Sequence, residues 1–514
     1  MQTVKVDVLV VGAGPTGLGA AIRLEELGQD SWLLCEQSTK YFDSVLEASV
    51  GKFTEKEAWV CLERECYIRY SNNWVPYPFQ NNLYCIPKQD QVDCLLGLVQ
   101  AKLDAATRPV GIKPRNFDEW IVQTMGQGLA RVFMRPYNFK VWATPCELMS
   151  STWLGERVSV VDYTKAITNT ILETRDAAWG PNAVFRFPKL AGGTGGIWQA
   201  VADKLLPRSK LEYNTQLVEV DLDNKIASFA NGKQVKYRNL VSTIPLDLLL
   251  DLAKKNSEES KSLLVHSSTN VLGFGIRGEN PHGSKCWLYF PEPNCPFYRA
   301  TVFSNYSPNN TPSANVLLPT LRLAGGDGEK LVNDPQPGPY WSVMLEVSES
   351  STHKPVDQAA IVSDCLRGCI EAGLLQVEDE VVSIYHKRLE HGYPTPSLRR
   401  DEILGKLLPE LQHKHQVWSR GRFGSWKYEV GNQDHSLILG VEAVDSIFNS
   451  QAGGGEEETL CKPNLVNSRG KNPTPRYMGK WFGFQVGKDK FKTKVPKLVG
   501  QRFATVEDYI RFLT

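Results

Sequence analysis

The chain has 514 residues, with 58 Lys and Arg against 57 Asp and Glu, so its formal net charge is +1. This length exceeds what one hydrophobic core supports, and we expect two or three domains. The near-neutral charge excludes a global basic field of the kind that holds nucleic acid or an anionic membrane. No apolar run reaches the roughly 18 residues of a membrane span, and residues 1–5 lead straight into a predicted strand. We therefore expect a cytoplasmic protein without a membrane span or a signal peptide.

The 11 cysteines are scattered, odd in number and free of Cys-x-x-Cys pairs. This usage indicates reduced thiols in a cytosolic protein. Cys365 and Cys369 are four residues apart on a predicted helix, where packing explains them better than a metal does. The 8 histidines also lack the spacing of metal ligands. The sequence therefore predicts no metal site.

The first predicted elements form a β-α-β unit. Residues 6–11 are apolar and rich in β-branched side chains, which is typical of a buried parallel strand. The turn that follows is Gly12-Ala13-Gly14-Pro15-Thr16-Gly17. In this pattern the first glycine permits a tight turn, the second lets the backbone approach a pyrophosphate, and the third lets the helix pack close to the strand.

A predicted helix over 16–27 directs its N-terminal N–H groups and its dipole at the phosphates. The next apolar run ends at Glu36, about 20 residues after the glycines, where a carboxylate accepts hydrogen bonds from ribose hydroxyls. An acid there argues against NADP, and a glycine pattern so near the start favours FAD over NAD by analogy with two-domain FAD proteins. The alternative is a tight turn without a ligand. The predicted cofactor-binding residues of this unit are Gly12, Gly14, Pro15, Thr16, Gly17 and Glu36.

Further elements follow along the chain. Apolar spacing predicts helices over 89–103, 117–134 and 167–174. Strands are predicted over 67–77, 217–228 with a turn at Asp223-Asn224, 240–242, 270–277, 286–290 and 340–346. Residues 308–339 are rich in Pro, Gly and Asn and predict a surface loop. Residues 453–514 predict a loosely attached extension with a Lys-rich, solvated tract and a short helix over 506–513.

Three clusters combine aromatic residues with polar or cationic ones: residues 74–81, residues 133–142 with 153–157, and residues 286–289 with 297–299. Aromatic side chains with a polar edge stack on nucleobases. The planar fork of arginine suits a diphosphate. Together the clusters predict a nucleoside-diphosphate ligand that is separate from the flavin, although core packing or a surface ion pair explains any single member.

Six segments carry a resemblance to a known family: residues 75–82, 134–142, 153–158, 185–198, 286–308 and 418–444. In these segments, and from the N-terminus to about Phe448, the chain resembles UDP-galactopyranose mutases of the eukaryotic, fungal type. The resemblance implies an isomerase of galactofuranose biosynthesis for the cell wall, which interconverts UDP-galactopyranose and UDP-galactofuranose. It also implies FAD that must be reduced, NADPH as the reductant, and a reaction through a sugar adduct on flavin N5.

The same resemblance implies roles for individual residues. Its catalytic positions fall on Arg157 and Arg299, which pair with the diphosphate, and on Asn182 beside the sugar. Its phosphate-binding tyrosines and uridine-binding positions fall on Tyr289, Tyr393, Tyr428, Tyr77, Gln80, Phe133, Asn138 and Trp142. Arg422, Asn432 and Gln433 match positions near the flavin and the sugar. A physical reason supports this last group, because residues 428–435 open a predicted helix over 436–448 whose N-terminus stabilises the negative charge of reduced flavin.

The chain departs from the family pattern after Glu36. Family members continue with a Gly-Gly strand and a Gly-Gly-His loop, whose His packs on the isoalloxazine, whereas here Lys40 is followed at once by Tyr41. About 27 residues are missing, the size of a strand–loop–strand unit. An expected Ser also reads Cys66. One interpretation is a divergent but working loop. Two others are a wrong exon boundary in the sequence and a catalytically impaired UDP-sugar- and FAD-binding copy. An FAD amine-oxidase-like oxidoreductase is a further alternative, which the arginines of the diphosphate site disfavour.

The predicted fold class is α/β, with a Rossmann-like FAD-binding domain, a helical domain and a twisted antiparallel sheet domain. We expect a discontinuous FAD-binding domain over 1–40, 183–265 and 394–451, and a mainly helical substrate domain over 86–182. The sheet domain is expected over 60–85 and 266–393, and the extension over 452–514. Besides UDP-galactose and FAD we expect no nucleic-acid or membrane partner, and we expect a homo-oligomer.

Overall fold

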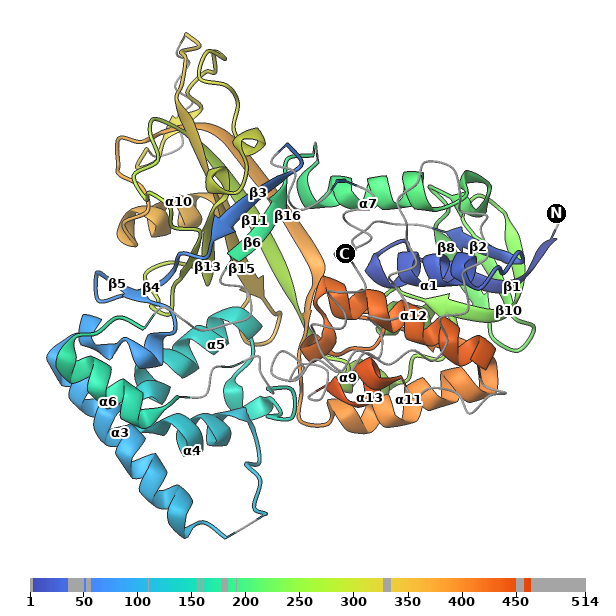
Figure 1. The fold of residues 1–514 in the computed structure, drawn as a ribbon, viewed down its shortest axis with the longest axis horizontal. Coiled ribbons are helices and arrows are strands. Elements are labelled where there is room, and N and C mark those ends of the chain that lie inside the picture. Colours follow the sequence, from blue (N-terminus) through green and yellow to red (C-terminus); the bar gives the residue numbers. More distant parts are fainter. Residues whose placement is uncertain are drawn as a thin grey trace, which may run out of the picture.

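The fold is that of a computed structural model, which describes residues 3–35, 50–51, 57–109, 111–154, 158, 161–176, 184–190, 192–326, 334–449 and 457–463 (Figure 1). Three predicted site residues, Glu36, Arg157 and Asn182, lie outside the described residues. So do the junction after Lys40 and the predicted helix over 506–513.

One sheet collects the elements of the nucleotide-binding unit. Within the described residues it has seven strands, in the order β7-β2-β1-β10-β9-β8 with β17 against β10. β1 (Thr3–Val11) lies parallel to β2 (Trp32–Cys35) and to β10 (Gln234–Ser242). The other strands are β7 (Leu211–Glu212), β8 (Leu217–Asp221), β9 (Ile226–Phe229) and β17 (Val417–Ser419). The parallel return of β10 and the β8–β9 hairpin confirm the strands predicted at 240–242 and 217–228.

Helices cover both faces of this sheet. α1 (Pro15–Glu26), α7 (Gly193–Leu205) and α12 (Gln433–Asn449) pack on the face that presents Val8 and Val10. α8 (Leu246–Leu252), α9 (Glu258–Leu263) and α11 (Arg400–His415) pack on the face that presents Leu9 and Val11. Successive apolar side chains of β1 therefore point into two different cores, as in a parallel strand that is buried on both sides.

A second, largely antiparallel sheet carries much of the aromatic sequence. Among the described residues it has eight strands, in the order β14-β16-β11-β15-β13-β12-β4-β5. These are β4 (Cys66–Tyr70), β5 (Asn73–Pro76), β11 (His266–Arg277), β12 (Trp287–Tyr289), β13 (Arg299–Val302), β14 (Arg322–Leu323), β15 (Tyr340–Glu349) and β16 (Glu380–Pro394). α10 (Ile361–Glu371) closes the core on one face. The long strands β11 and β16 run from this sheet towards the nucleotide-binding layers (Figure 1).

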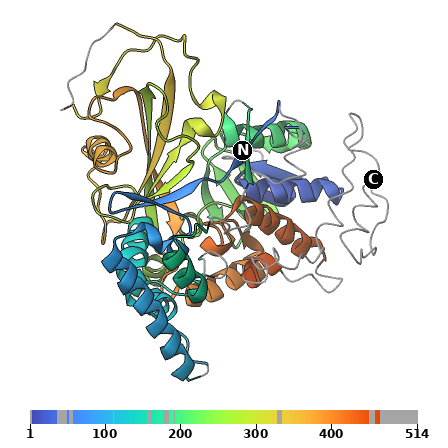
Figure 2. The same ribbon diagram turned by 60° about the vertical axis from the view of Figure 1, so that its left-hand side comes forward.

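The remaining helices gather beside β4 and β5. They are α3 (Lys88–Thr107), α4 (Phe117–Leu129), a π-helical segment (Ala130–Met134), α5 (Arg135–Trp142) and α6 (Tyr163–Leu172). They share one apolar core with β4 and β5, and Figure 2 shows them in blue and green-blue at the foot of the antiparallel sheet. A small two-stranded sheet joins β3 (Trp59–Glu63) to β6 (Val184–Pro188). None of the described helices is both long and apolar enough to cross a bilayer.

Two predicted elements were wrong. The single strand expected over 67–77 is the hairpin β4–β5, because Ser71 and Asn72 both adopt positive φ, at 46° and 62°, and so form the tight turn that twisted hairpins favour. The single helix expected over 117–134 breaks at Gly126, whose φ is 75°. A Cβ at Gly126 would lie 2.1 Å from the carbonyl oxygen of Gly97, so close packing of α4 against α3 requires glycine here.

Candidate functional site

The glycine turn between β1 and α1 has the geometry of a pyrophosphate cradle. Gly12 has φ +94°, and a Cβ there would lie 2.1 Å from Oγ1 of Thr243. A Cβ at Gly17 would lie 1.7 Å from the carbonyl oxygen of Gly12. The first intrahelical bond of α1 runs from the Leu18 amide to Gly14, which caps the helix without a side-chain bond. The amides of Thr16 and Gly17 therefore precede the intrahelical bonds, as an anion site requires.

A loop from the far end of the chain packs against this turn. A Cβ at Gly421 would lie 2.8 Å from Oγ1 of Thr16, and one at Gly440 would lie 1.9 Å from the Thr16 carbonyl oxygen. Nε of Arg422 donates to the Gly431 carbonyl over 3.0 Å. Asn432 and Gln433 follow at the start of α12. The backbone at Gly421 and the middle of α12 at Gly440 thus lie against the first turn of α1, and Arg422 directly follows Gly421.

Two clusters of aromatic side chains lie next to Arg422 and Tyr428. In the first, Tyr428 contacts Trp142 at 4.8 Å and Tyr393 at 5.3 Å between ring centroids. Arg422 lies over the Tyr393 ring at 5.5 Å. The second group contains Tyr77, Tyr137, Tyr289 and Phe133, with Tyr289 at 5.6 Å from Tyr77 and 5.8 Å from Tyr137. All of these rings belong to one apolar core, so the structure brings most of the predicted substrate-binding residues together.

Arg299 is a cation of this aromatic region that a carboxylate holds in a fixed orientation. Its Nε and Nη2 donate to the two carboxylate oxygens of Glu346 over 2.8 and 2.7 Å. Nη1 makes no hydrogen bond within the described part of the chain, so it can donate to a ligand. Burial alone would lower the pKa of Arg299, but Glu346 and the neighbouring tyrosines together outweigh burial and raise the pKa. The guanidinium therefore keeps its charge in an apolar setting, where it attracts an anion strongly.

The surrounding tyrosines keep their protons. Burial raises the pKa of Tyr77 to about 12, and burial raises that of Tyr289 well above its usual value. At neutral pH both hydroxyls are therefore donors for phosphate oxygens. Gln80 and Asn138 are buried nearby, and Nδ2 of Asn138 donates to the Met134 carbonyl over 2.8 Å.

Two features of this region were missed by sequence reasoning. Tyr306 is 6% exposed, and its hydroxyl has no hydrogen-bond partner among the described residues. It falls inside the segment 286–308 that carries the family resemblance, which was the available signal. The guanidinium of Arg64 lies over Tyr77 at 5.6 Å and over Trp287 at 6.0 Å. A second cation and an unpaired hydroxyl thus border the same aromatic group.

Cys66, where the family pattern has Ser, packs against a second thiol. Cys66 and Cys286 are both buried and hydrogen-bond to each other, because β4 and β12 pair in parallel at this point. That hydrogen bond and burial raise the pKa of the Cys66 thiol. The Cys286 thiol also contacts the Glu65 carbonyl at 3.2 Å. The hydrogen bond with Cys66 lowers the pKa of the Cys286 thiol, so the two thiols of this buried pair are shifted in opposite directions.

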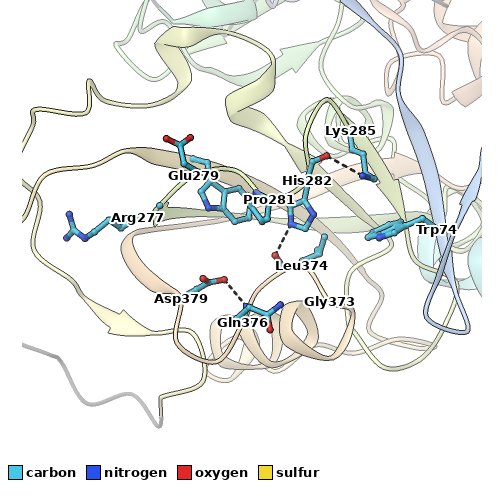
Figure 3. A pocket seen from close by; sticks show the side chains of 12 residues that line it. Trp74, Arg277, Glu279, Pro281, His282, Lys285, Gly373, Leu374, Gln376 and Asp379 are labelled. Carbon is cyan, nitrogen blue, oxygen red and sulfur yellow. Dashed lines mark hydrogen bonds between the residues drawn. The ribbon is translucent and has the colours of Figure 1, made fainter.

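A cavity of about 400 Å³ lies elsewhere, beside α10 (Figure 3). Its lining includes Trp74, Arg277, His282, Lys285 and Asp379. His282 is tied to the Leu374 carbonyl at 2.9 Å, and Arg277 to Glu380 at 2.7 Å. None of the predicted site residues lines this cavity.

The three-layer nucleotide unit, its glycine turn and the attached antiparallel sheet define an α/β flavoprotein with an FAD-binding fold. No protein-family model matches the chain. A solved structure of reduced UDP-galactopyranose mutase is 41% identical over 90% of this chain and 99% of its own, with a TM-score of 0.77. The chain belongs to the UDP-galactopyranose mutase family.

More distant structures share the fold alone. Wild-type putrescine oxidase bound to putrescine is 11% identical over 87% of this chain and 99% of its own, with a TM-score of 0.52. A CLA-producing fatty acid isomerase from P. acnes is 13% identical over 86% and 99%, also with a TM-score of 0.52.

Proposed function

We propose that this chain is a flavin-dependent isomerase that interconverts UDP-galactopyranose and UDP-galactofuranose. One observation carries the proposal: Arg299, fixed by Glu346 and with Nη1 available, interacts electrostatically with Tyr289 and Tyr393 of the aromatic core. Arg422 lies over the Tyr393 ring and directly follows Gly421, which packs on Thr16 of the glycine turn. A diphosphate donor and a dinucleotide cradle are the two anion sites that a flavin-dependent UDP-sugar enzyme needs.

The residues at the first site fit FAD. The steric demand for glycine at Gly12 and Gly17 leaves room for a pyrophosphate against the backbone, with Gly14, Pro15 and Thr16 at the start of α1. Glu36 would hold the ribose. Arg422 and Gln433 would lie near the ring system, where the N-terminus of α12 favours negative charge. Bound FAD in its reduced form supplies the nucleophile N5. We propose NADPH as the reductant.

The residues at the second site would hold the UDP-sugar. Arg299 and Arg157 would take the diphosphate, and the hydroxyls of Tyr289, Tyr393 and Tyr428 would donate to its oxygens. Tyr77, Gln80, Phe133, Asn138 and Trp142 would enclose the uridine, with Asn182 and Asn432 beside the sugar. Because the arginines stay charged, they would stabilise UDP when it leaves the sugar and hold it in place for its return. We further propose a cytoplasmic homo-oligomer with the domain division given above.

A second candidate is a catalytically impaired copy that still binds FAD and UDP-sugars. The direct passage from Lys40 to Tyr41, without the Gly-Gly-His loop, favours it. An amine-oxidase-like activity would leave the fixed orientation of Arg299 without a purpose.

The flavin spectrum of the purified protein, followed by turnover of UDP-galactofuranose after dithionite reduction, tests the proposal. Formation of UDP-galactopyranose supports the isomerase. UDP binding without turnover would indicate the impaired copy. Failure to bind UDP would overturn both.

A further inference from the structure

Asp247, His266 and His391 converge where the antiparallel sheet meets the nucleotide-binding layers. Asp247 lies on α8, His266 begins β11 and His391 lies near the end of β16. Nε2 of His391 is 2.9 Å from Oδ2 of Asp247. The two imidazole rings stack with 4.4 Å between centroids and 16° between planes. One ligand atom from each of the three residues lies within 4.8 Å of the other two.

A β-bulge aims His391 at this cluster. Between the pairs Ser267–Tyr393 and Thr269–Leu389, β11 advances by two residues and β16 by four. The extra residues of β16 include His391 and Gly392, and a Cβ at Gly392 would lie 2.1 Å from Oγ1 of Thr269. Bulges of this kind redirect a side chain out of the regular alternation of a strand.

The cluster of Asp247, His266 and His391 is enclosed by aromatic rings on one side and is partly open to solvent. Phe423 and Trp426 meet the histidine rings edge to face, with Phe423 at 5.1 Å from His391 and Trp426 at 5.9 Å from His266. They wall off one side, while the side chains of Asp247, His266 and His391 stay 15–21% exposed. Glu390 approaches Nε2 of His266 at 3.5 Å. An ion can therefore enter from solvent, and the Glu390 carboxylate is close enough to supply a fourth ligand atom.

We propose that Asp247, His266 and His391 bind a divalent transition-metal ion, Zn²⁺ in the first instance. Two imidazoles and one carboxylate are a ligand set that suits zinc, with water or Glu390 as the fourth ligand. Bonds of about 2.0–2.2 Å require the three ligand atoms to approach by side-chain rotation, with the metal replacing the proton shared by His391 and Asp247. The residues are 19 and 125 positions apart in sequence, which is why spacing gave no sign of them.

Such an ion would tie together three elements that border the proposed active site. Tyr393 follows His391 by two residues on β16, and Arg422 directly precedes Phe423. The metal would therefore fix the start of β11 and the end of β16 relative to α8, with Phe423 packed against the ligand His391. We assign it a structural role at this junction.

The test uses the full-length protein after chelation and dialysis. Titration calorimetry with ZnCl₂ should give one equivalent of bound zinc, and Co²⁺ should give the d–d spectrum of a tetrahedral site without thiolate charge-transfer bands. Asp247→Asn and His391→Gln should each weaken zinc binding by at least about tenfold. His413→Ala, which alters an exposed histidine on α11, should leave it unchanged.

Circular dichroism of each variant shows whether it folds. If a variant does not fold, zinc uptake by the wild-type protein still tests the proposal. A wild-type protein that takes up no zinc would overturn the proposal. So would an equivalent of zinc that both variants retain, or a Co²⁺ spectrum dominated by thiolate bands.

Discussion

Arg299 and Glu346 stand directly opposite each other on β13 and β15, and this register forms a bidentate ion pair at the candidate site. Tyr298 also donates to Glu346, so the carboxylate orients the guanidinium from a fixed position. The Glu346 side chain is only 11% exposed. Removal of Arg299 would leave that charge buried without its partner, which is costly. Tests at this position must therefore separate ligand binding from stability.

Arg299→Ala should weaken UDP binding by about 2–4 kcal/mol, because charge-assisted hydrogen bonds to a buried diphosphate are strong. It should also lower the free energy of unfolding by about 3–5 kcal/mol. Arg299→Lys keeps the charge but loses the planar fork, so it should retain most of the stability and still lose UDP affinity. Calorimetry and thermal unfolding measure the two effects. Wild-type UDP affinity in the Lys variant would contradict a role for Arg299 in UDP binding. Arg157→Ala tests the second proposed diphosphate arginine in the same way.

The unpaired hydroxyl of Tyr306 supplies a second test. Tyr306→Phe removes a buried polar atom that has no partner, so the unliganded protein should be as stable as the wild type or about 1 kcal/mol more stable. UDP affinity should fall by about 1–3 kcal/mol if the hydroxyl donates to the ligand. Tyr237→Phe is the matched control, because Tyr237 also has a buried unpaired hydroxyl but packs in the nucleotide sheet. Equal UDP affinities in both variants would exclude Tyr306 from the site.

The sequence was sufficient for elements whose signal is local. The glycine turn and the apolar strand before it predicted the β-α-β unit, and the strand at 240–242 lies beside β1 as expected. Ser71 and Asn72 are of turn-favouring types but lack the stronger Asn-Gly signature of a tight hairpin turn, and the hairpin was missed. Gly126 looked like an ordinary helical position, because its need for φ 75° arises from contact with Gly97 on another helix.

The site shows the same division between local and distant information. The family motifs indicated Arg299, but Glu346, its partner, lies 47 residues away and has no motif of its own. Nothing in the sequence brings Cys66 to Cys286 or His266 to His391, because strand register and a bulge decide those contacts. The proposed roles of Glu36, Arg157 and Asn182 stay predictions.

Gly12→Ala should abolish tight FAD binding, because φ +94° and a contact of 2.1 Å with Thr243 exclude a side chain. Gly17→Ala should do the same through its 1.7 Å approach to the Gly12 carbonyl. Gly195→Ala on α7 meets no atom within 4 Å and should leave FAD affinity unchanged, with a stability gain of up to about 1 kcal/mol. Quenching of flavin fluorescence on binding measures all three. Normal affinity in the Gly12 variant would exclude this turn as the cradle.

Lys354 should make stability rise at alkaline pH. Burial, and then repulsion from Lys140, lower its pKa to about 8 from 10.5. Between these values the unfolded chain binds more protons than the folded one, so the free energy of unfolding increases with pH, by about 3 kcal/mol in total. Below pH 8 the full penalty of the buried charge remains. Lys354→Met should be more stable than the wild type at pH 7, and the difference should shrink towards pH 10.5. A constant difference in urea unfolding across this range would contradict the assignment.

Catalysis by the chain as it stands should be weak. Gly12 and Gly17 can hold the pyrophosphate, but the ring system lacks the Gly-Gly-His segment that family members place against it, so N5 would be less well positioned. A misplacement of about 1 Å can cost roughly 100-fold in rate. We therefore expect FAD that is sub-stoichiometric or easily lost, together with slow turnover of UDP-galactofuranose.

Insertion of a Gly-Gly strand and a Gly-Gly-His loop between Lys40 and Tyr41 should raise both the FAD content and the rate. An inserted segment of equal length made of Gly and Ser is the control, because it restores the spacing without the His or the strand. UDP affinity should be the same in all three proteins, since the residues proposed to bind UDP lie outside the insertion. If the natural chain holds a full equivalent of FAD and turns over as fast as the restored protein, the short connection after Lys40 is a working loop and the interpretation of a deletion is wrong.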